Sequence, residues 1–118
     1  TQIICSEDTV DVYNPKVVQA TMGSLARLKV CYTDLLLLLP QIKQPDFGAM
    51  LNGENIYQTD FGNEGIIILG NEGKGIRPET QQLIRRKITI PQAGGAESLN
   101  VAIAAAIFCN EANRNKLK

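Results

Sequence analysis

A glycine-rich loop carries the residues of this chain whose types and spacing are best suited to chemistry. Residues 65–76 read Gly-Ile-Ile-Ile-Leu-Gly-Asn-Glu-Gly-Lys-Gly-Ile. The four consecutive apolar residues predict a strand buried on both faces, as found in parallel sheets. Three glycines follow within six residues, and glycine lets a ligand approach the backbone closely. Open α/β sheets bind ligands outside the carboxyl ends of their strands, so we predict a ligand site at this loop, with Glu72 and Lys74 inside it.

Two common phosphate-binding patterns do not fit this loop. A Walker loop has four residues between its first glycine and the Gly-Lys pair, whereas two residues separate Gly70 from Gly73-Lys74. The dinucleotide pattern Gly-x-Gly-x-x-Gly does not match either. The spacing therefore disfavours a nucleotide-binding protein with an ordinary phosphate loop. The loop alone leaves two alternatives open, a ligand site and a plain glycine-rich turn between a strand and a helix.

Composition places the chain among ordinary globular proteins. Its 118 residues are enough for one domain, 1–118, with its own core, and 44% of them are hydrophobic. Twelve basic and twelve acidic residues give a formal net charge of zero. Contacts with a phosphate backbone normally need a basic excess, so this balance disfavours nucleic-acid binding by this chain alone.

Histidine is absent, which excludes Ser-His and Cys-His catalysis and most transition-metal sites. Cys5, Cys31 and Cys109 are odd in number, far apart and outside any Cys-x-x-Cys pair. They indicate buried thiols in a reducing cytoplasm, with no disulfide and no bound metal. We expect no membrane contact, because the longest apolar runs are too short to span a bilayer.

Strand and helix patterns alternate along the chain. We predict strands at residues 1–5, 29–32, 47–51, 66–69 and 88–90, with a turn at Asn52-Gly53. The first predicted helix runs from Asn14-Pro15 to about Leu28, and a well-buried second helix covers residues 35–39 after Thr33 as its N-cap. A third helix is predicted from Arg77-Pro78-Glu79 to a basic end at 85–87. The last runs from Leu99 to about Asn113, with Ser98 as its N-cap. The alternation predicts an α/β domain whose mainly parallel sheet is flanked by helices. The basic triplet 85–87 is either a solvated helix end or an RNA contact.

Two stretches in this order carry a family resemblance. Residues 67–76, Ile-Ile-Leu-Gly-Asn-Glu-Gly-Lys-Gly-Ile, are followed by residues 88–102, Ile-Thr-Ile-Pro-Gln-Ala-Gly-Gly-Ala-Glu-Ser-Leu-Asn-Val-Ala. Together they resemble the second and third motifs of the SpoU (TrmH-like) RNA 2′-O-ribose methyltransferases, of the SPOUT class. Residues 14–23 also resemble the helix that precedes these motifs, so the resemblance covers nearly the whole chain.

The resemblance implies a mainly parallel α/β fold with a deep C-terminal trefoil knot, bound S-adenosyl-L-methionine (AdoMet), a homodimer and a cytoplasmic location. It implies methyl transfer to a ribose hydroxyl of tRNA or rRNA. The family's cofactor contacts fall on Gly70, Ile90 and Leu99, and we expect backbone from the turn Leu51, Asn52 and Gly53 to join them. Ile90 and Leu99 would provide apolar walls, and loop backbone groups would bind the adenine edge.

Three polar side chains are expected around the methyl group and the ribose: Glu72, Ser98 and Asn100. Ser98 could instead be only a helix N-cap, and Glu72 could be a hydrogen-bonding partner for loop backbone. Asn100, one turn into an apolar helix, is harder to explain by packing. The alanines at 102 and 104–106 give the last helix a face on which another backbone can pack closely, which favours a dimer.

One departure from the family pattern matters for activity. The first motif, an Asn-x-Gly-x-x-x-Arg run on the strand-to-helix unit upstream, is missing, and its arginine is the residue most often assigned to activating the ribose hydroxyl. Arg27, Arg77, Arg85 and Arg86 stand in different contexts. We expect this chain to be the C-terminal part of a longer enzyme and to be inactive alone. The alternative is a non-catalytic RNA-binding or dimerisation module of the same fold.

Overall fold

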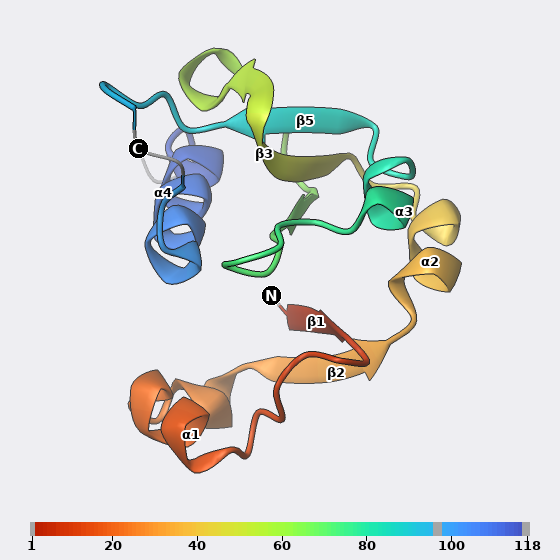
Figure 1. Ribbon diagram of the computed structural model, residues 1–118, viewed down its shortest axis with the longest axis vertical. Helices are drawn as coiled ribbons and strands as arrows, with labels where there is room; N and C mark the ends of the chain where they lie inside the picture. Colours follow the sequence, from red (N-terminus) through yellow and green to blue (C-terminus); the bar gives the residue numbers. More distant parts are fainter. Residues whose placement is uncertain (1, 96–97, 117–118) are drawn as a thin grey trace. The chain divides into compact units, whose positions relative to one another are not determined.

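The computed structural model describes residues 2–95 and 98–116. The chain forms two compact units, Thr1–Gln41 and Ile42–Lys118, which are described separately (Figure 1). The expectation of one domain over residues 1–118 therefore stays a prediction.

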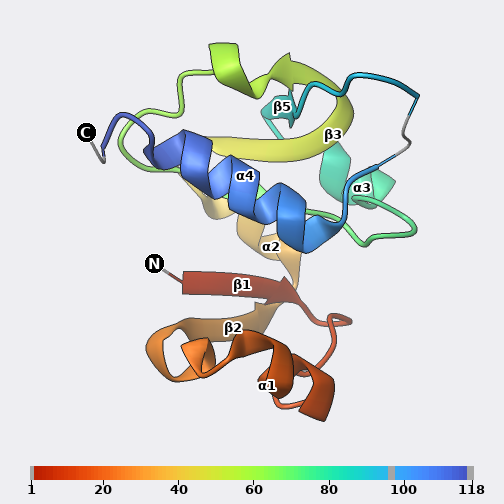
Figure 2. The same ribbon diagram turned by 90° about the vertical axis from the view of Figure 1, so that its left-hand side faces the viewer.

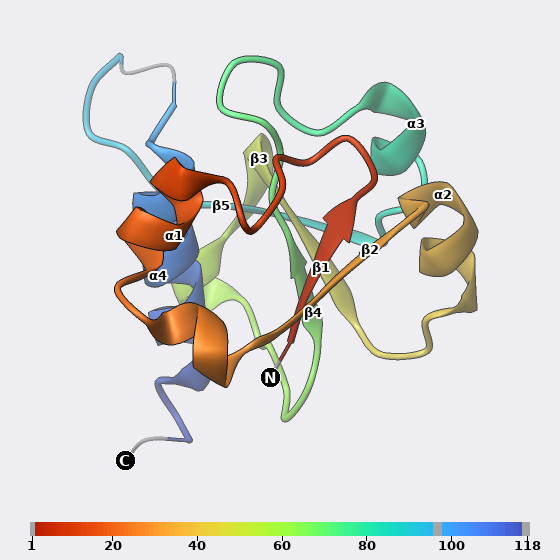
Figure 3. The ribbon, with the colours of Figure 1, turned by 90° about the horizontal axis from the view of Figure 1, so that it is seen from below.

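The first unit contains a two-stranded parallel sheet. Strands β1 (Gln2–Ser6) and β2 (Lys29–Thr33) pair in parallel, with Ile4 opposite Cys31 and Cys5 opposite Tyr32 (Figure 3). Between them lie helix α1 (Pro15–Thr21) and a 3-10 helix at Ser24–Arg27, and after them come α2 (Leu35–Leu38) and a 3-10 helix at Leu39–Gln41. Both strands were predicted from the sequence.

The predicted helix from Asn14 to about Leu28 is wrong in its second half. Asn14 caps α1 as expected, since its side chain accepts a hydrogen bond from the backbone N–H of Lys16, and Pro15 follows it. Met22 and Gly23 then adopt left-handed conformations, with φ of 49° and 84°. Left-handed residues end a helix, and glycine takes that conformation without steric cost. The helical pattern continues only as the short 3-10 segment.

The leucine run also differs from its prediction. Asp34, not Thr33, caps α2 by accepting a hydrogen bond from the N–H of Leu36. Only Leu39 of the run is buried, while Leu37 is 67% exposed. Helix α2 is four residues long because Pro40 cannot continue it. A helix of about one turn can bury only the leucines on one of its faces.

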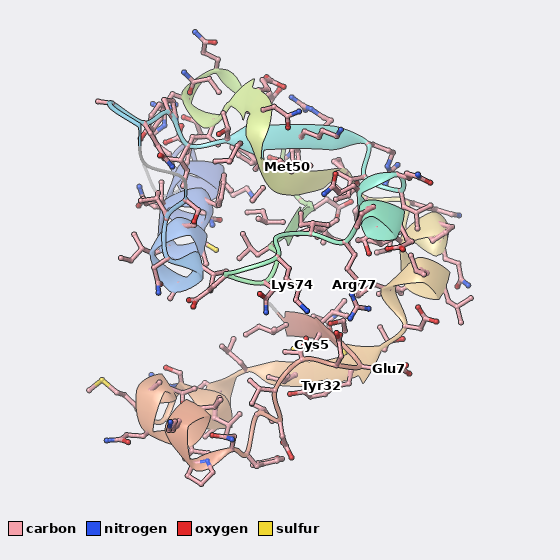
Figure 4. All side chains as sticks on the ribbon, in the orientation of Figure 1. Cys5, Glu7, Tyr32, Met50, Lys74 and Arg77 are labelled. Carbon is pink, nitrogen blue, oxygen red and sulfur yellow. The ribbon has the colours of Figure 1, made fainter. Side chains whose placement is uncertain are left out.

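The cysteines of this sheet cannot pair with each other. Successive side chains point to opposite faces, so Cys5, opposite Tyr32, and Cys31, opposite Ile4, lie on different faces. Cys5 and Tyr32 are labelled on the two neighbouring strands in Figure 4. Burial raises the pKa of the Cys5 thiol and Cys31 adds to that rise, while a hydrogen bond with Tyr32 acts against it. All three cysteines are free, but Cys109 is exposed, which corrects the expectation of buried thiols.

The second unit is built on a three-stranded parallel sheet in the order β4-β3-β5. Its elements are β3 (Asp46–Asn55), a 3-10 helix at Ile56–Gln58, β4 (Ile66–Ile68), α3 (Pro78–Gln81), β5 (Arg86–Thr89) and α4 (Val101–Asn113). Figure 2 shows α4 running alongside this sheet. The core consists of Phe47, Ile56, Phe61, Ile88 and Phe108, the last from α4. An α/β fold with parallel sheets flanked by helices is thereby confirmed.

Strand β3 is longer and less regular than predicted. Ala49 and Glu54 both lie opposite Ile88 of β5, so residues 50–53 form an irregularity inside the strand. The predicted strand 47–51 therefore ends too early, and Asn52-Gly53 is not a turn between elements. Gly53 is required there, because an added Cβ would lie 2.5 Å from the backbone of Ile88.

The basic triplet 85–87 is not a helix end, because α3 stops at Gln81 and β5 already starts at Arg86. Arg85 donates from Nε to the buried Asp46 (2.6 Å) and from its guanidinium to the carbonyls of Ile42 and Gln44. Arg86 bonds to Glu54 and to the carbonyl of Asp60. Both arginines therefore hold the fold together, so the alternative of an RNA contact loses its support for these two.

We expect Asp46→Ala to lower the free energy of unfolding by about 3 kcal/mol, because it removes a buried carboxylate and its charge-assisted hydrogen bond to the half-exposed Arg85 side chain. Asp46 is 2% exposed and also accepts a hydrogen bond from the backbone N–H of Arg85 at 2.7 Å. Glu54→Ala is the matched control, since Glu54 is also a β3 carboxylate paired with an arginine of the 85–87 segment, but its side chain is 43% exposed whereas that of Asp46 is 3% exposed. Its expected cost is below about 1 kcal/mol. Urea unfolding of both variants checks this, and equal costs would contradict it.

Candidate functional site

The loop after β4 is a preformed turn. Asn71 and Gly75 form an antiparallel bridge with two backbone hydrogen bonds, of 3.1 and 2.8 Å. The Asn71 side chain also accepts hydrogen bonds from the N–H groups of Gly73 and Lys74. Figure 4 labels Lys74 on this loop. Glu72 lies at the tip of the loop and is exposed.

Gly70 is required by the backbone of the same loop. A Cβ atom at this position would lie 2.2 Å from the carbonyl carbon of Gly75 and 2.3 Å from the backbone nitrogen of Ile76. No side chain fits there without moving the returning segment. The two chain segments at the base of the loop are therefore held in close contact.

Helix α4 begins two residues later than predicted, at Val101 and not at Leu99. Asn100 is its N-cap, because its Oδ1 accepts hydrogen bonds from the N–H groups of Ala102 (2.9 Å) and Ile103 (3.3 Å). Ser98 is not the cap, and Leu99 precedes the helix. The expectation that Asn100 lies one turn inside the helix is wrong, and so is the alternative that Ser98 only caps it.

The structure brings together two of the three predicted catalytic residues. The side-chain nitrogen Nδ2 of Asn100 donates a hydrogen bond to Oε1 of Glu72, at 3.0 Å. The glycine-rich loop therefore contacts the first turn of α4 (Figure 1). Ser98 lies two residues before Asn100 and is exposed. These three side chains lie on the loop and on the segment that leads into α4.

The predicted cofactor residues fall into two groups. Gly53, Gly70 and Ile90 have structural roles, since the two glycines admit neighbouring backbone and Ile90 packs on the core. Leu51 and Leu99, in contrast, are large apolar side chains that are 69% and 37% exposed. Asn52, next to Leu51, is also exposed.

A hollow of about 380 Å³ in this unit lies elsewhere. It is mainly polar and is lined by residues 57–63, by Glu111 and Ala112 of α4, and by residues 114–116 after the helix. The described residues contain no cluster of three acidic or cysteine side chains able to hold a metal ion. Within the same residues, no helix combines the length and apolar character needed to cross a bilayer.

Sequence reasoning did not identify the role of Asn71. Its side chain orders the loop, although the sequence does not place it among the site residues. An asparagine two residues before a glycine is a known turn pattern, in which the side chain bonds the backbone further along. That pattern was available in Asn71-Glu72-Gly73.

A parallel sheet with an ordered glycine-rich loop at the carboxyl end of its edge strand β4 has the architecture of an α/β ligand-binding domain. A model of the SpoU rRNA Methylase family matches residues 1–110. This chain therefore belongs to that family, which confirms the resemblance drawn from the two motifs.

Similar proteins are RNA methyltransferases. The 23S rRNA (guanosine-2′-O-)-methyltransferase RlmB of Acinetobacter baylyi is 31% identical over 98% of this chain and 49% of its own length. A TrmH-family structure from Porphyromonas gingivalis has 39% identity and a TM-score of 0.87, over 97% of this chain and 49% of that one. The SpoU methyltransferase AviRb from Streptomyces viridochromogenes, in complex with AdoMet, has 28% identity and a TM-score of 0.86, over the same shares. The chain spans about half the length of these relatives.

Proposed function

We propose that this chain is the AdoMet-binding part of an RNA 2′-O-ribose methyltransferase that acts on tRNA or rRNA. The observation that carries the proposal is the Glu72–Asn100 hydrogen bond, which joins the second and third family motifs in one site. Membership of the SpoU family and the named activities of relatives such as RlmB support it.

The residues at this edge of the sheet suit AdoMet. The cofactor has an apolar-faced adenine and a methionyl chain, and exposed Leu51 and Leu99 offer apolar surface for them. Ile90 is half-buried and packs on the core, and Asn52 adds an exposed polar side chain. Gly53 and Gly70 keep the backbone segments close, so we assign them an indirect role in cofactor binding. AdoMet, when bound, supplies an electrophilic methyl group.

The three polar residues would orient the ribose. Glu72 presents an exposed carboxylate that can accept a hydrogen bond from a ribose hydroxyl, and Ser98 can donate or accept one. Neither is well matched to take the hydroxyl proton, because a carboxyl group is far more acidic than a ribose hydroxyl. We therefore assign binding and orientation to this chain and proton removal to the family's first-motif arginine.

The finer fold and location belong to the same proposal. The similarity to SpoU methyltransferase structures supports a C-terminal trefoil knot that takes in β4, β5 and α4. A cytoplasmic location, with no metal and no membrane partner, fits an enzyme that modifies RNA. A non-catalytic RNA-binding module of the same fold is the second candidate.

We also propose a homodimer through α4 and the 14–28 segment, and we expect Ala106→Glu to weaken it by more than about 10-fold. Ala102, Ile103 and Ala106 are exposed on α4 in the single chain, and burying an unpaired carboxylate between two chains is costly. Light scattering over a concentration series measures the effect. The control is Gln82→Glu, because Gln82 is an exposed residue that follows α3 and lies outside the proposed interface. A monomer at high concentration would contradict the dimer.

The proposed function is tested by calorimetry with AdoMet and with ATP on the folded protein. We expect heat of binding from AdoMet or its demethylated product and none from ATP, because the loop lacks the Walker spacing. Binding of ATP without a response to AdoMet would overturn the proposal. Methylation of unmodified total RNA by the complete protein separates the enzyme from the non-catalytic module.

A further inference from the structure

We propose that Asn100 is a positioning residue, whose side chain holds the Glu72 carboxylate in place for the reaction while it also caps α4. This inference rests on the proposed function. It goes beyond that function by separating the two residues: Glu72 would contact the ribose, and Asn100 would act only through Glu72.

The surroundings of Asn100 fix the orientation of its side-chain amide. The carbonyl oxygen Oδ1 already accepts hydrogen bonds from the N–H groups of Ala102 and Ile103. The nitrogen Nδ2 can only donate, and it faces Oε1 of Glu72 at 3.0 Å. The reverse orientation would place a carbonyl oxygen against a carboxylate and two hydrogen-bond donors against two N–H groups. Glu72 therefore receives a donor whose direction is set by the helix.

The contact holds one oxygen of Glu72 and leaves the other available. Oε2 has no hydrogen-bond partner among the described residues, whereas Oε1 is bound. The base of the loop is fixed by the Asn71–Gly75 bridge and by the Asn71 side chain. Without Asn100, only the exposed tip of the loop would orient Glu72. Among the residues that the structure describes, one side-chain hydrogen bond thus joins the loop tip to the helix start, 28 residues further along the chain.

The substitution Asn100→Ser separates the two roles of the side chain. Serine is as good an N-cap as asparagine but is too short to reach Glu72, and it adds no charge. In the complete protein we expect kcat about 10²-fold lower, as for a misplaced catalytic group, with the KM for AdoMet within about 2-fold. The unfolding temperature should be unchanged. Asn100→Ala loses the cap as well and should unfold at a lower temperature.

A purely structural role for Asn100 predicts the opposite pattern, with full kcat in Asn100→Ser and a loss only in Asn100→Ala. That result would overturn the proposal. A second measurement does not depend on activity: in NMR spectra, Glu72→Ala should shift the side-chain amide resonances of Asn100 and leave the backbone amides of Ala102 and Ile103 in place. If the side-chain amide resonances of Asn100 keep their chemical shifts in Glu72→Ala, the proposal is also overturned.

The same experiment distinguishes this inference from the proposed function. If the protein without any substitution neither binds AdoMet nor methylates RNA, both the proposed function and the positioning role of Asn100 are overturned. An active, AdoMet-binding protein whose Asn100→Ser variant keeps full kcat would leave the function standing and overturn only the role of Asn100. Glu72→Gln adds a check, since glutamine can still accept the Asn100 hydrogen bond but carries no charge.

Discussion

Replacing Gly70 with alanine is expected to weaken AdoMet binding by more than about 10-fold and to destabilise the protein. The new Cβ would lie 2.2 Å from the backbone of Gly75, so the loop could not close as it does. Overpacking of this kind typically costs about 1–3 kcal/mol, and each 1.4 kcal/mol is tenfold in affinity. The loss would come from a displaced loop and not from contact between the new methyl group and the cofactor. Calorimetry with AdoMet and thermal unfolding measure the two effects.

Gly73→Ala is the matched control in the same loop. Its Cβ would meet only Oδ1 of Asn71, at 3.5 Å, and the position does not require a positive φ. We expect its affinity for AdoMet to stay within about 2-fold of the unchanged chain, as for surface substitutions. Equal losses in the two variants would show that the loop is sensitive to any added side chain, and that the close contact at Gly70 is not the cause.

Methyl transfer by residues 1–118 alone is expected to be about 10²–10⁴-fold slower than transfer by a protein that also carries the family's first-motif arginine. A ribose hydroxyl is a very weak acid and needs help in losing its proton. Arg85 is occupied by Asp46 and by two backbone carbonyls, and Arg86 is held by Glu54 and Asp60. These two arginines therefore cannot replace the missing one without breaking the sheet.

The measurement is labelled methyl transfer to unmodified total RNA. It compares the chain alone, the chain joined to an upstream segment with the first motif, and that longer protein with the motif arginine replaced by alanine. The last variant should still bind AdoMet. Robust transfer by residues 1–118 alone would contradict the prediction and place the proton acceptor within them, and Glu72→Gln would then identify it.

The sequence by itself was sufficient for the elements with strong local signals. The β-branched run before the loop lies in β4 and pairs with β3, and Asn14-Pro15 begins α1. These features follow from side-chain shape, capping and fixed proline geometry, which depend on neighbours in the chain. The two motifs identified the family for the same reason, because their residues are close in sequence.

Other boundaries were wrong because distant contacts decide them. Arg85 and Arg86 have the composition of a basic helix end, yet buried Asp46 and exposed Glu54, which lie more than 30 residues away, hold them in and beside β5. The leucine run 35–39 has an apolar composition typical of a buried helix, but only Leu39 is buried and Leu36 and Leu37 are exposed. The helix or strand propensity of a local segment carries no information about contacts with residues far away in the sequence.

At the site, the sequence determined which residues are present and the tertiary structure determined what they do. Glu72, Ser98 and Asn100 were chosen from residue type and motif alone. Only the fold shows that Asn100 caps α4 and donates to Glu72, and that Gly70 is required by the backbone of Gly75. A hydrogen bond over 28 residues and a backbone contact closer than a side chain allows are properties of chain paths in space, and residue spacing carries no record of them.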